Sequence, residues 1–202
     1  FPYTTLFRSH LRLGFYKGEI FTEIPTMDRD VPPIVNLMLE VNPDIVTVAF
    51  DPEGSGPDTH YKVLQAVSQA LRIYEKRTGR SDLRVLGYRN VWFRFHPAEV
   101  NLYVPTSLRS LSDMEAAFDT CFNTQRTASF PSYEYDGPFA HLARKIQVEQ
   151  FDHVRNFLGE EFFVYNEDHG LRACCGIVYL REMSLQEFYT KSEELKHIAE
   201  AQ

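Results

Sequence analysis

An apolar run, a glycine-containing loop and a long amphipathic stretch follow one another near the middle of the chain and constrain its fold most. The run Ile45-Val46-Thr47-Val48-Ala49-Phe50 is typical of a strand that is covered on both faces. Residues 59–77 then place apolar side chains at three- and four-residue spacing, which predicts a helix with one buried face. This order predicts a parallel strand followed by a loop and a helix. The apolar positions of the helix are Val63, Ala66, Val67, Ala70, Leu71 and Tyr74.

The loop between them, residues 51–60, contains two glycines, two prolines, three carboxylates and one histidine. Open α/β sheets bind their ligands at the carboxyl ends of the strands, where this loop is expected to lie. An imidazole beside carboxylates is a common metal-binding arrangement, so His60 is a candidate metal ligand between Asp58 and the rest of the helix. The alternative is a surface histidine on a helix that Asp58 or Thr59 caps. A zinc site needs three protein ligands, and no H-x-x-H, H-E-x-x-H or C-x-x-C pattern accompanies His60.

Composition excludes several classes of protein. The 202 residues suffice for one substantial domain, and 44% of them are hydrophobic, enough for a sizeable core. A net charge of −7 gives no basic surface for nucleic acid or an anionic membrane. No apolar run approaches the ~20 residues of a membrane span.

The cysteine content indicates the redox environment. Three cysteines, two of them adjacent, do not fit a disulfide framework and favour reduced thiols in a cytoplasmic protein.

The rest of the chain alternates predicted strands and helices, which indicates the α/β class. Pro32-Pro33 are expected to begin a helix that ends before Asn42-Pro43, and Ser112 with Glu115 forms a capping box that is expected to begin another. A serine–glutamate pair at Ser184 is expected to begin the last helix. Further expected elements are strands at 11–16, 83–95, 100–104, 162–165 and 176–180, loops at 17–31 and 126–137, and helices at 112–125 and 138–158.

The first nine residues, FPYTTLFRS, look like a translated sequencing adapter, and no methionine precedes them. We therefore exclude residues 1–9 from the fold argument. Residues 10–202 are then expected to be the C-terminal portion of a domain whose beginning was lost.

Several segments of the chain, in order and spacing, resemble the LmbE/PIG-L family of metal-dependent N-acetylglucosaminyl deacetylases. The similarity is closest to the branch that is fused behind a glucosamine-6-phosphate deaminase-like domain, and it covers about residues 10–190. The segments that carry it are Leu11-Arg12-Leu13-Gly14-Phe15-Tyr16, Asn42-Pro43-Asp44-Ile45-Val46, Asp51-Pro52-Glu53-Gly54, Thr59-His60-Tyr61-Lys62-Val63, Tyr88-Arg89-Asn90-Val91-Trp92, Val104-Pro105, Phe122-Asn123-Thr124-Gln125 and residues 180–188.

This resemblance implies a Rossmann-like α/β fold that lacks its first strand and first metal motif. In the family, a Pro-His-Pro-Asp-Asp motif supplies two zinc ligands and the catalytic base, and a later histidine, which His60 matches, supplies the third ligand. The motif is absent from this chain, so Asp58 is the candidate catalytic carboxylate among the residues present. Many members carry a second histidine three residues before the ligand; here that residue is Pro57. The implied cofactor is Zn²⁺ or another divalent metal, and the implied partner is a small amino-sugar substrate.

Asp51 and Arg89 are candidate substrate-binding residues. Arg89 could hold a sugar hydroxyl or phosphate with its fork of donors, or pair with a surface carboxylate. Asp51 could contact substrate or orient His60, or simply end the strand as a turn residue. His96 is expected in a turn, and His141 and His153 are expected to be solvated or packed on a helix. Cleft-lining residues could also come from Asn123 and Gln125, or from aromatic side chains at Trp92, Tyr133, Tyr135 and Phe139, for which packing is the alternative.

The resemblance leaves three functions to consider. The first is zinc-assisted hydrolysis of an N-acetyl group on a glucosamine-type substrate. The second is a non-catalytic sugar- or phosphosugar-binding module, in which Pro57 marks a site that has lost its chemistry. The third is membership of a fused glucosamine-6-phosphate deaminase protein, although no residue here supports that reaction by itself.

Overall fold

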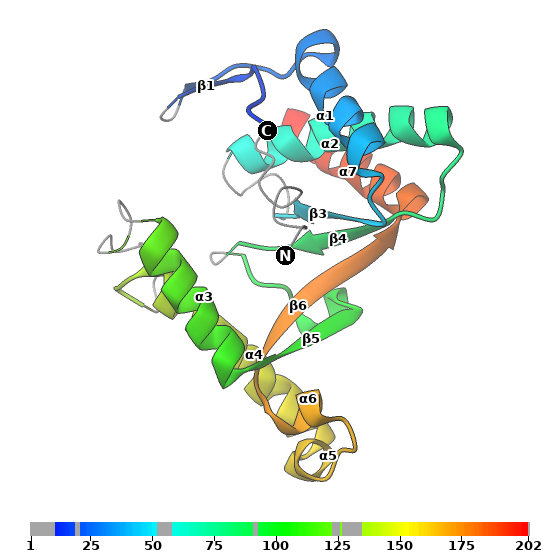
Figure 1. The fold of residues 1–202 in the computed structure, drawn as a ribbon. Helices are drawn as coiled ribbons and strands as arrows, with labels where there is room; N and C mark the ends of the chain where they lie inside the picture. Colours follow the sequence, from blue (N-terminus) through cyan, green and yellow to red (C-terminus); the bar gives the residue numbers. More distant parts are fainter. Residues whose placement is uncertain are drawn as a thin grey trace. The chain divides into compact units, whose positions relative to one another are not determined.

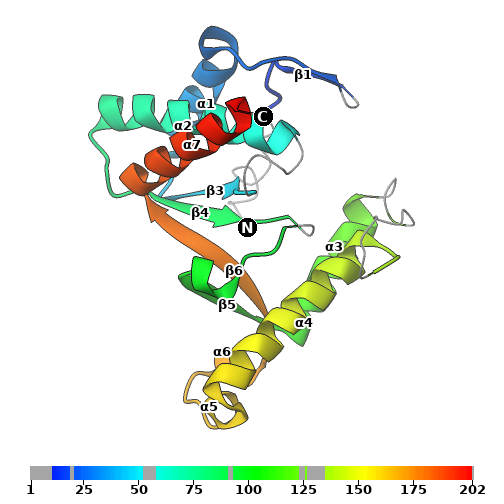
Figure 2. The ribbon, with the colours of Figure 1, turned by 180° about the vertical axis from the view of Figure 1, so that it is seen from behind.

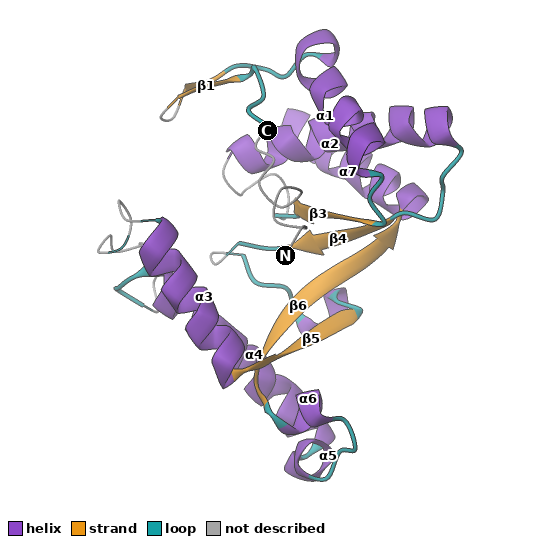
Figure 3. Cartoon of the chain, viewed as in Figure 1, coloured by secondary structure: helices purple, strands orange, loops and turns teal. Residues whose placement is uncertain are grey.

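The computed structural model describes residues 11–18, 21–51, 58–90, 93–122, 126 and 135–201. Its fold is of the mixed α/β kind, with a four-stranded sheet of order β3-β4-β6-β5 flanked by helices (Figure 3). The chain separates into two compact units, Phe1–Phe93 with Arg181–Gln202 and Arg94–Leu180. Strand β6 (Cys174–Ser184) contributes its last residues to the first unit and its earlier residues to the second.

In the first unit, β3 (Ile45–Ala49) pairs in parallel with β4 (Arg84–Tyr88), as the sequence predicts. β4 pairs antiparallel with the end of β6. Helices α1 (Met27–Val41), α2 (Asp58–Thr78) and α7 (Leu185–Glu200) pack together on one side of these strands (Figures 1 and 2). A two-stranded ribbon, β1 (Tyr16–Gly18) with β2 (Phe21–Thr22), precedes them. The expected strand at 11–16 is therefore wrong for its first five residues, because only Tyr16 has a partner strand.

The core of the first unit lies between these helices and strands, and the stripe predicted on α2 is part of it. Leu71 and Tyr74 of α2 are fully buried, as is Phe188 of α7, whereas Val63 stays 40% exposed. Among the described residues no helix combines the length and the apolar character needed to cross a membrane. The members of this core are Val31, Ile34, Val35, Met38, Val48, Leu64, Ala66, Ala70, Leu71, Tyr74, Leu83, Val85, Met183, Leu185, Phe188, Tyr189 and Leu195.

Strand β3 is not covered on both faces, which corrects the expectation from its apolar run. Only Val48 is buried, and Ile45 is 41% exposed. The cause is its position in the sheet: β3 is the edge strand in the described residues and pairs with β4 alone. An apolar run therefore identified the strand correctly but overstated how much of it is buried.

Helix α1 begins at Met27, five residues before the expected start, so that Pro32 and Pro33 lie inside it. The fixed φ of proline suits a helix, although each proline removes one backbone donor. A buried carboxylate, Asp30, lies in the first turn of the same helix. Asp30 is 0% exposed and accepts hydrogen bonds from the main-chain N–H of Phe15 at 3.0 Å and of Thr26 at 2.9 Å.

The Arg29 side chain completes this arrangement. Its Nε and Nη2 atoms donate to Asp30 Oδ2 at 3.1 and 3.0 Å. Burial alone would raise the pKa of Asp30, but the hydrogen bonds from Arg29 and the two backbone donors outweigh it, and the net pKa lies below the ordinary value. The charged carboxylate thus joins the segment before β1 to the beginning of α1.

The second unit pairs β5 (Leu102–Ser107) antiparallel with the first part of β6. Its helices are α3 (Leu108–Cys121), α4 (Phe139–Leu158), α5 (Glu160–Val164) and α6 (His169–Arg172), with a short 3₁₀ helix η3 (Pro97–Glu99). Residues 162–165, expected as a strand, instead belong mostly to α5. Two glutamates in the first turn favour a helix start there, and Phe163 packs edge-on against Phe151 of α4, with ring centroids 4.9 Å apart.

Several boundaries differ from the sequence-based expectation, whereas the long helices agree with it. α4 lies at the expected residues, and α7 begins where the serine–glutamate pair places it, because Ser184 accepts from Glu187 N at 3.2 Å. β4 is shorter than expected, and β6 is longer. α3 starts four residues before Ser112, because Ser107 is its N-cap and accepts from Ser110 N at 3.2 Å.

Replacing the two candidate cap serines separately tests this correction. Ser107→Ala removes the acceptor for an otherwise unpaired N–H and is expected to lower the free energy of unfolding by about 1 kcal/mol. Ser112→Ala is the matched control; Ser112 is exposed within the helix, and we expect no loss of stability. Urea denaturation measures both values. A larger loss for Ser112→Ala than for Ser107→Ala would restore the capping box expected from the sequence.

Candidate functional site

Two of the predicted site residues meet at the carboxyl end of β3. Asp51 lies two residues beyond the last residue of β3, and His60 lies in the first turn of α2. His60 Nδ1 and Asp51 Oδ2 are 2.9 Å apart, within hydrogen-bond distance. Residues 52–57 between them, including Glu53 and Pro57, are outside the described residues. The contact links the end of the strand to the beginning of the helix that follows it.

A second contact fixes the Asp51 carboxylate from the neighbouring strand. Asp51 is only 6% exposed, and its Oδ1 accepts a hydrogen bond from Asn90 N at 3.1 Å. Asn90 follows β4 by two residues, so the carboxyl ends of the parallel strands β3 and β4 converge on this carboxylate. Each Asp51 oxygen thus has a donor that the fold supplies. The parallel pairing of β3 and β4 creates the site.

The geometry determines how the His60 ring is used. A carboxylate only accepts hydrogen bonds, so the neutral ring must carry its proton on Nδ1 and its lone pair on Nε2. The His60 side chain is 36% exposed, and no described residue hydrogen-bonds Nε2. A histidine that donates one ring N–H to a carboxylate while its other nitrogen faces outward is the usual form of a metal-ligating histidine. This arrangement favours the orienting interpretation of Asp51 over the turn interpretation.

Asp58, the candidate catalytic carboxylate, is held by two neighbours. Its Oδ2 accepts from Thr22 Oγ1 of β2 at 2.6 Å and from Lys62 Nζ at 2.5 Å. Burial alone would raise the pKa of Asp58, but the hydrogen bonds from Lys62 and Thr22 outweigh it, and the net pKa is below the ordinary value. Asp58 is therefore a permanently charged group at neutral pH and a weak base. These contacts suit an electrostatic role better than proton abstraction.

Two residues at the end of β4, Tyr88 and Arg89, lie close to the Asp51 end of the site. Arg89 is half-buried and follows the last β4 residue directly, beside Asn90. Tyr88, which the sequence did not indicate as a site residue, ends the strand. Burial raises the pKa of the Tyr88 hydroxyl, and the Asp51 carboxylate raises it further. The signal that could have found Tyr88 is the parallel register, because Tyr88 pairs with Ala49, close to Asp51 along β3.

The described residues do not form a complete metal site by themselves. Among the described residues, no group of three or more His, Cys, Asp or Glu side chains lies close enough together to hold a metal ion. His60 with Asp51 fits one ligand and its orienting carboxylate. A zinc site built on His60 needs further ligands from outside the described residues.

The other histidines and the cysteines have different environments. His96 Nδ1 accepts from Ala98 N at 3.2 Å, which confirms the expected turn. His141 and His153 are exposed on α4, as expected.

Among the described residues, the cysteines and the candidate aromatic residues give no further site. Burial raises the pKa of the Cys174 thiol, and all three cysteines are free. Phe139 stacks on Phe118 at 5.4 Å, in agreement with the packing interpretation. The expectations for Trp92, Asn123, Gln125 and Tyr133 fall outside the described residues.

Comparison of this chain with models of protein families, with curated protein sequences and with solved structures found no match.

Proposed function

We propose that this chain forms part of the active site of a zinc-dependent amide hydrolase, with His60 as one metal ligand. The substrate class that the sequence resemblance suggests is an N-acetylglucosamine-type sugar, which loses its acetyl group. The observation that supports this proposal is the 2.9 Å contact between Asp51 and His60 at the carboxyl ends of β3 and β4. A buried carboxylate that orients an accessible imidazole is what a metal ligand needs.

Each residue has a definite task under this proposal. Asp51 fixes the ring orientation and the tautomer of His60. A bound zinc ion would lower the pKa of a water molecule and polarise the amide carbonyl. Asp58, whose charge is paired with Lys62, holds the beginning of α2 against Thr22 of β2. Arg89, at the end of β4, can hold a hydroxyl or phosphate of the sugar.

A non-catalytic sugar-binding module is the second candidate. It is favoured by the lack of a three-ligand group among the described residues and by proline at position 57. The Asp51–His60 pair would then orient His60 to hydrogen-bond a sugar hydroxyl through Nε2. The two candidates differ in whether an amide bond is broken.

Acetate release by the full gene product distinguishes them. With Zn²⁺ present, we expect acetate to be released from an N-acetylglucosamine-type substrate, to stop with a zinc chelator and to resume when zinc is returned. Acetate can be measured enzymatically and zinc by atomic absorption. Sugar binding by calorimetry without acetate release, at full zinc loading, would establish the binding module instead. Acetate release that persists after complete zinc removal would also contradict the proposal.

A further inference from the structure

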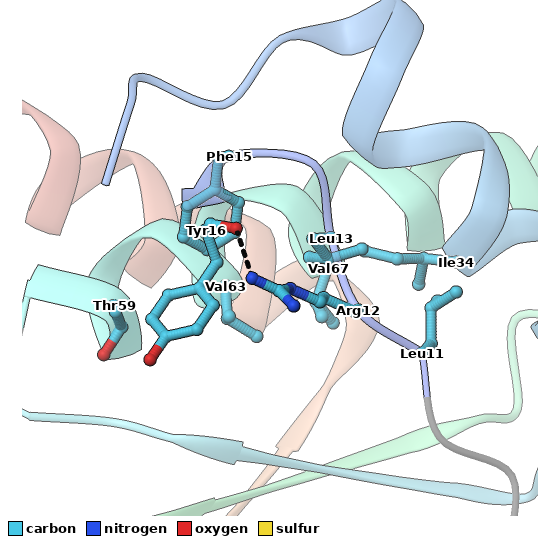
Figure 4. A pocket seen from close by; sticks show the side chains of 9 residues that line it. All are labelled: Leu11, Arg12, Leu13, Phe15, Tyr16, Ile34, Thr59, Val63 and Val67. Atoms are coloured by element: carbon cyan, nitrogen blue, oxygen red, sulfur yellow. Dashed lines mark hydrogen bonds between the residues drawn. The ribbon is translucent and has the colours of Figure 1, made fainter. Parts of the chain in front are cut away.

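An open groove of about 390 Å³ lies beside the N-terminal half of α2 (Figure 4). All of its walls belong to the first unit: the segment before β1, helix α1 and helix α2. Its volume falls within the range of small-molecule sites, roughly 300–1,000 Å³. The lining residues are Leu11, Arg12, Leu13, Phe15, Tyr16, Ile34, Thr59, Val63 and Val67.

Most of the groove is aliphatic, and part of that surface faces solvent. Leu11 and Val63 are each 40% exposed, although both are large apolar residues that normally prefer the core. Phe15 and Ile34, by contrast, are buried lining residues. Figure 4 shows Leu11, Leu13 and Ile34 together at one end of the groove. This end suits an aliphatic chain, which would remove these side chains from water.

The opposite end is polar, and a positive charge lies between the two ends. Figure 4 shows the hydroxyl groups of Tyr16 and Thr59 on the same side, with the Arg12 guanidinium between them and the aliphatic end. Arg12 Nη2 donates to the Tyr16 carbonyl at 3.4 Å, and the guanidinium lies 5.5 Å from the centre of the Tyr16 ring. Among the described residues, this long hydrogen bond occupies one of the five donors of the guanidinium, which leaves donors that can face a ligand. Thr59 lies in the first turn of α2, where the helix dipole also favours negative charge.

We propose that this groove binds a small amphipathic anion, namely a medium-length aliphatic chain that ends in a carboxylate. The aliphatic chain lies along Leu13, Ile34 and Val67, and the carboxylate pairs with Arg12 near the Thr59 hydroxyl. A single guanidinium balances one negative charge, which favours a carboxylate over a doubly charged phosphate. The nearest acidic side chain on α2, Asp58, is already neutralised by Lys62.

The binding of octanoate tests this proposal independently of the zinc chemistry, because it is measured in the presence of a metal chelator. We expect octanoate to bind the full gene product at least about tenfold more tightly than 1-octanol, and acetate to bind more weakly than either. Calorimetry gives the affinities, and octyl phosphate is the comparison for the head group. Equal affinities for octanoate and octanol, or tighter binding of octyl phosphate than of octanoate, would overturn the proposal.

Two variants locate the binding site. Arg12→Gln keeps most of the side-chain length and is expected to abolish the preference for octanoate over octanol. Val63→Glu places a carboxylate at an exposed position of the groove and is expected to prevent octanoate binding without unfolding α2. Arg109→Gln, at a 90% exposed arginine of the second unit, is the matched control and should leave binding unchanged. Thermal unfolding of each variant verifies that it folds. Octanoate binding that survives Arg12→Gln and Val63→Glu in folded protein would place the ligand elsewhere and reject this groove.

Discussion

His60→Ala is expected to remove zinc binding and acetate release from the full gene product, whereas Asp51→Asn is expected to weaken both by roughly 10- to 100-fold. The difference follows from the two roles. Under the proposed function His60 supplies the ligand atom itself, and no described residue beside it can replace Nε2. Asp51 acts through the His60 ring, and an asparagine can both donate and accept at the same place, so the ring loses its fixed tautomer.

The controls for this prediction are chosen from the same chain. His141→Ala removes an exposed histidine from α4 of the second unit and should leave zinc content unchanged. Zinc content is measured after gel filtration and affinity by competition with a chromogenic chelator. A His60→Ala protein that folds and keeps its full zinc content would show that His60 is not a ligand. A loss in Asp51→Asn equal to that in His60→Ala would show that Asp51 itself binds the metal.

Asp30→Ala is expected to lower the free energy of unfolding by about 2–4 kcal/mol, the largest stability change that we predict. The substitution leaves the buried main-chain N–H of Phe15 and the N–H of the exposed Thr26 without their acceptor, and it removes the charge beside Arg29. Asp28→Ala is the control, because Asp28 is an exposed acidic residue of the same first turn. Its loss should be limited to the helix-dipole contribution, about 0.3–1 kcal/mol.

The same carboxylate predicts a pH dependence with a definite sign. The pKa of Asp30 is lower in the folded chain than the value of about 3.9 for an unfolded aspartate. Its contribution is therefore complete above the unfolded pKa and is lost as the pH falls through the folded pKa. The stability difference between the natural chain and Asp30→Ala should be constant near neutral pH and shrink below about pH 4. Urea denaturation at several pH values measures it; a difference that grows on acidification would contradict the proposed charge state.

Helix α2 and the contact at its beginning show what local sequence can predict. The three- and four-residue spacing from Val63 to Tyr74 is a property of the chain alone, and the helix lies where the spacing places it. The parallel strand before it and the location of Asp51 and His60 at the strand end follow from the same short segment. The sequence could suggest that Asp51 orients His60, as one alternative to a substrate contact or a turn role, because Asp51 and His60 lie within the same loop.

The remaining features depend on partners far away in the sequence. Asn90 N reaches Asp51 only because β3 and β4 pair in one particular register. Because nearly every residue has a backbone N–H, the residue type at position 90 does not predict this hydrogen bond. The start of α1 was missed because Asp30 holds the segment before it through Phe15, fifteen residues away. The proline pair predicts a helix start at Pro32 from local sequence alone, whereas the contact between Phe15 and Asp30 cannot be recognised locally. The exposure of β3 likewise depends on which strands lie beside it and not on its own residues.

The tautomer of His60 is the most direct test of the central claim, that Asp51 orients this ring so that Nε2 can bind a ligand. Nitrogen-15 NMR of the imidazole, at a pH where the ring is neutral, distinguishes a proton on Nδ1 from one on Nε2. We predict the Nδ1–H form in the natural chain and a mixture of both forms in Asp51→Asn. A neutral His60 ring that carries its proton on Nε2 in the natural chain would contradict the account.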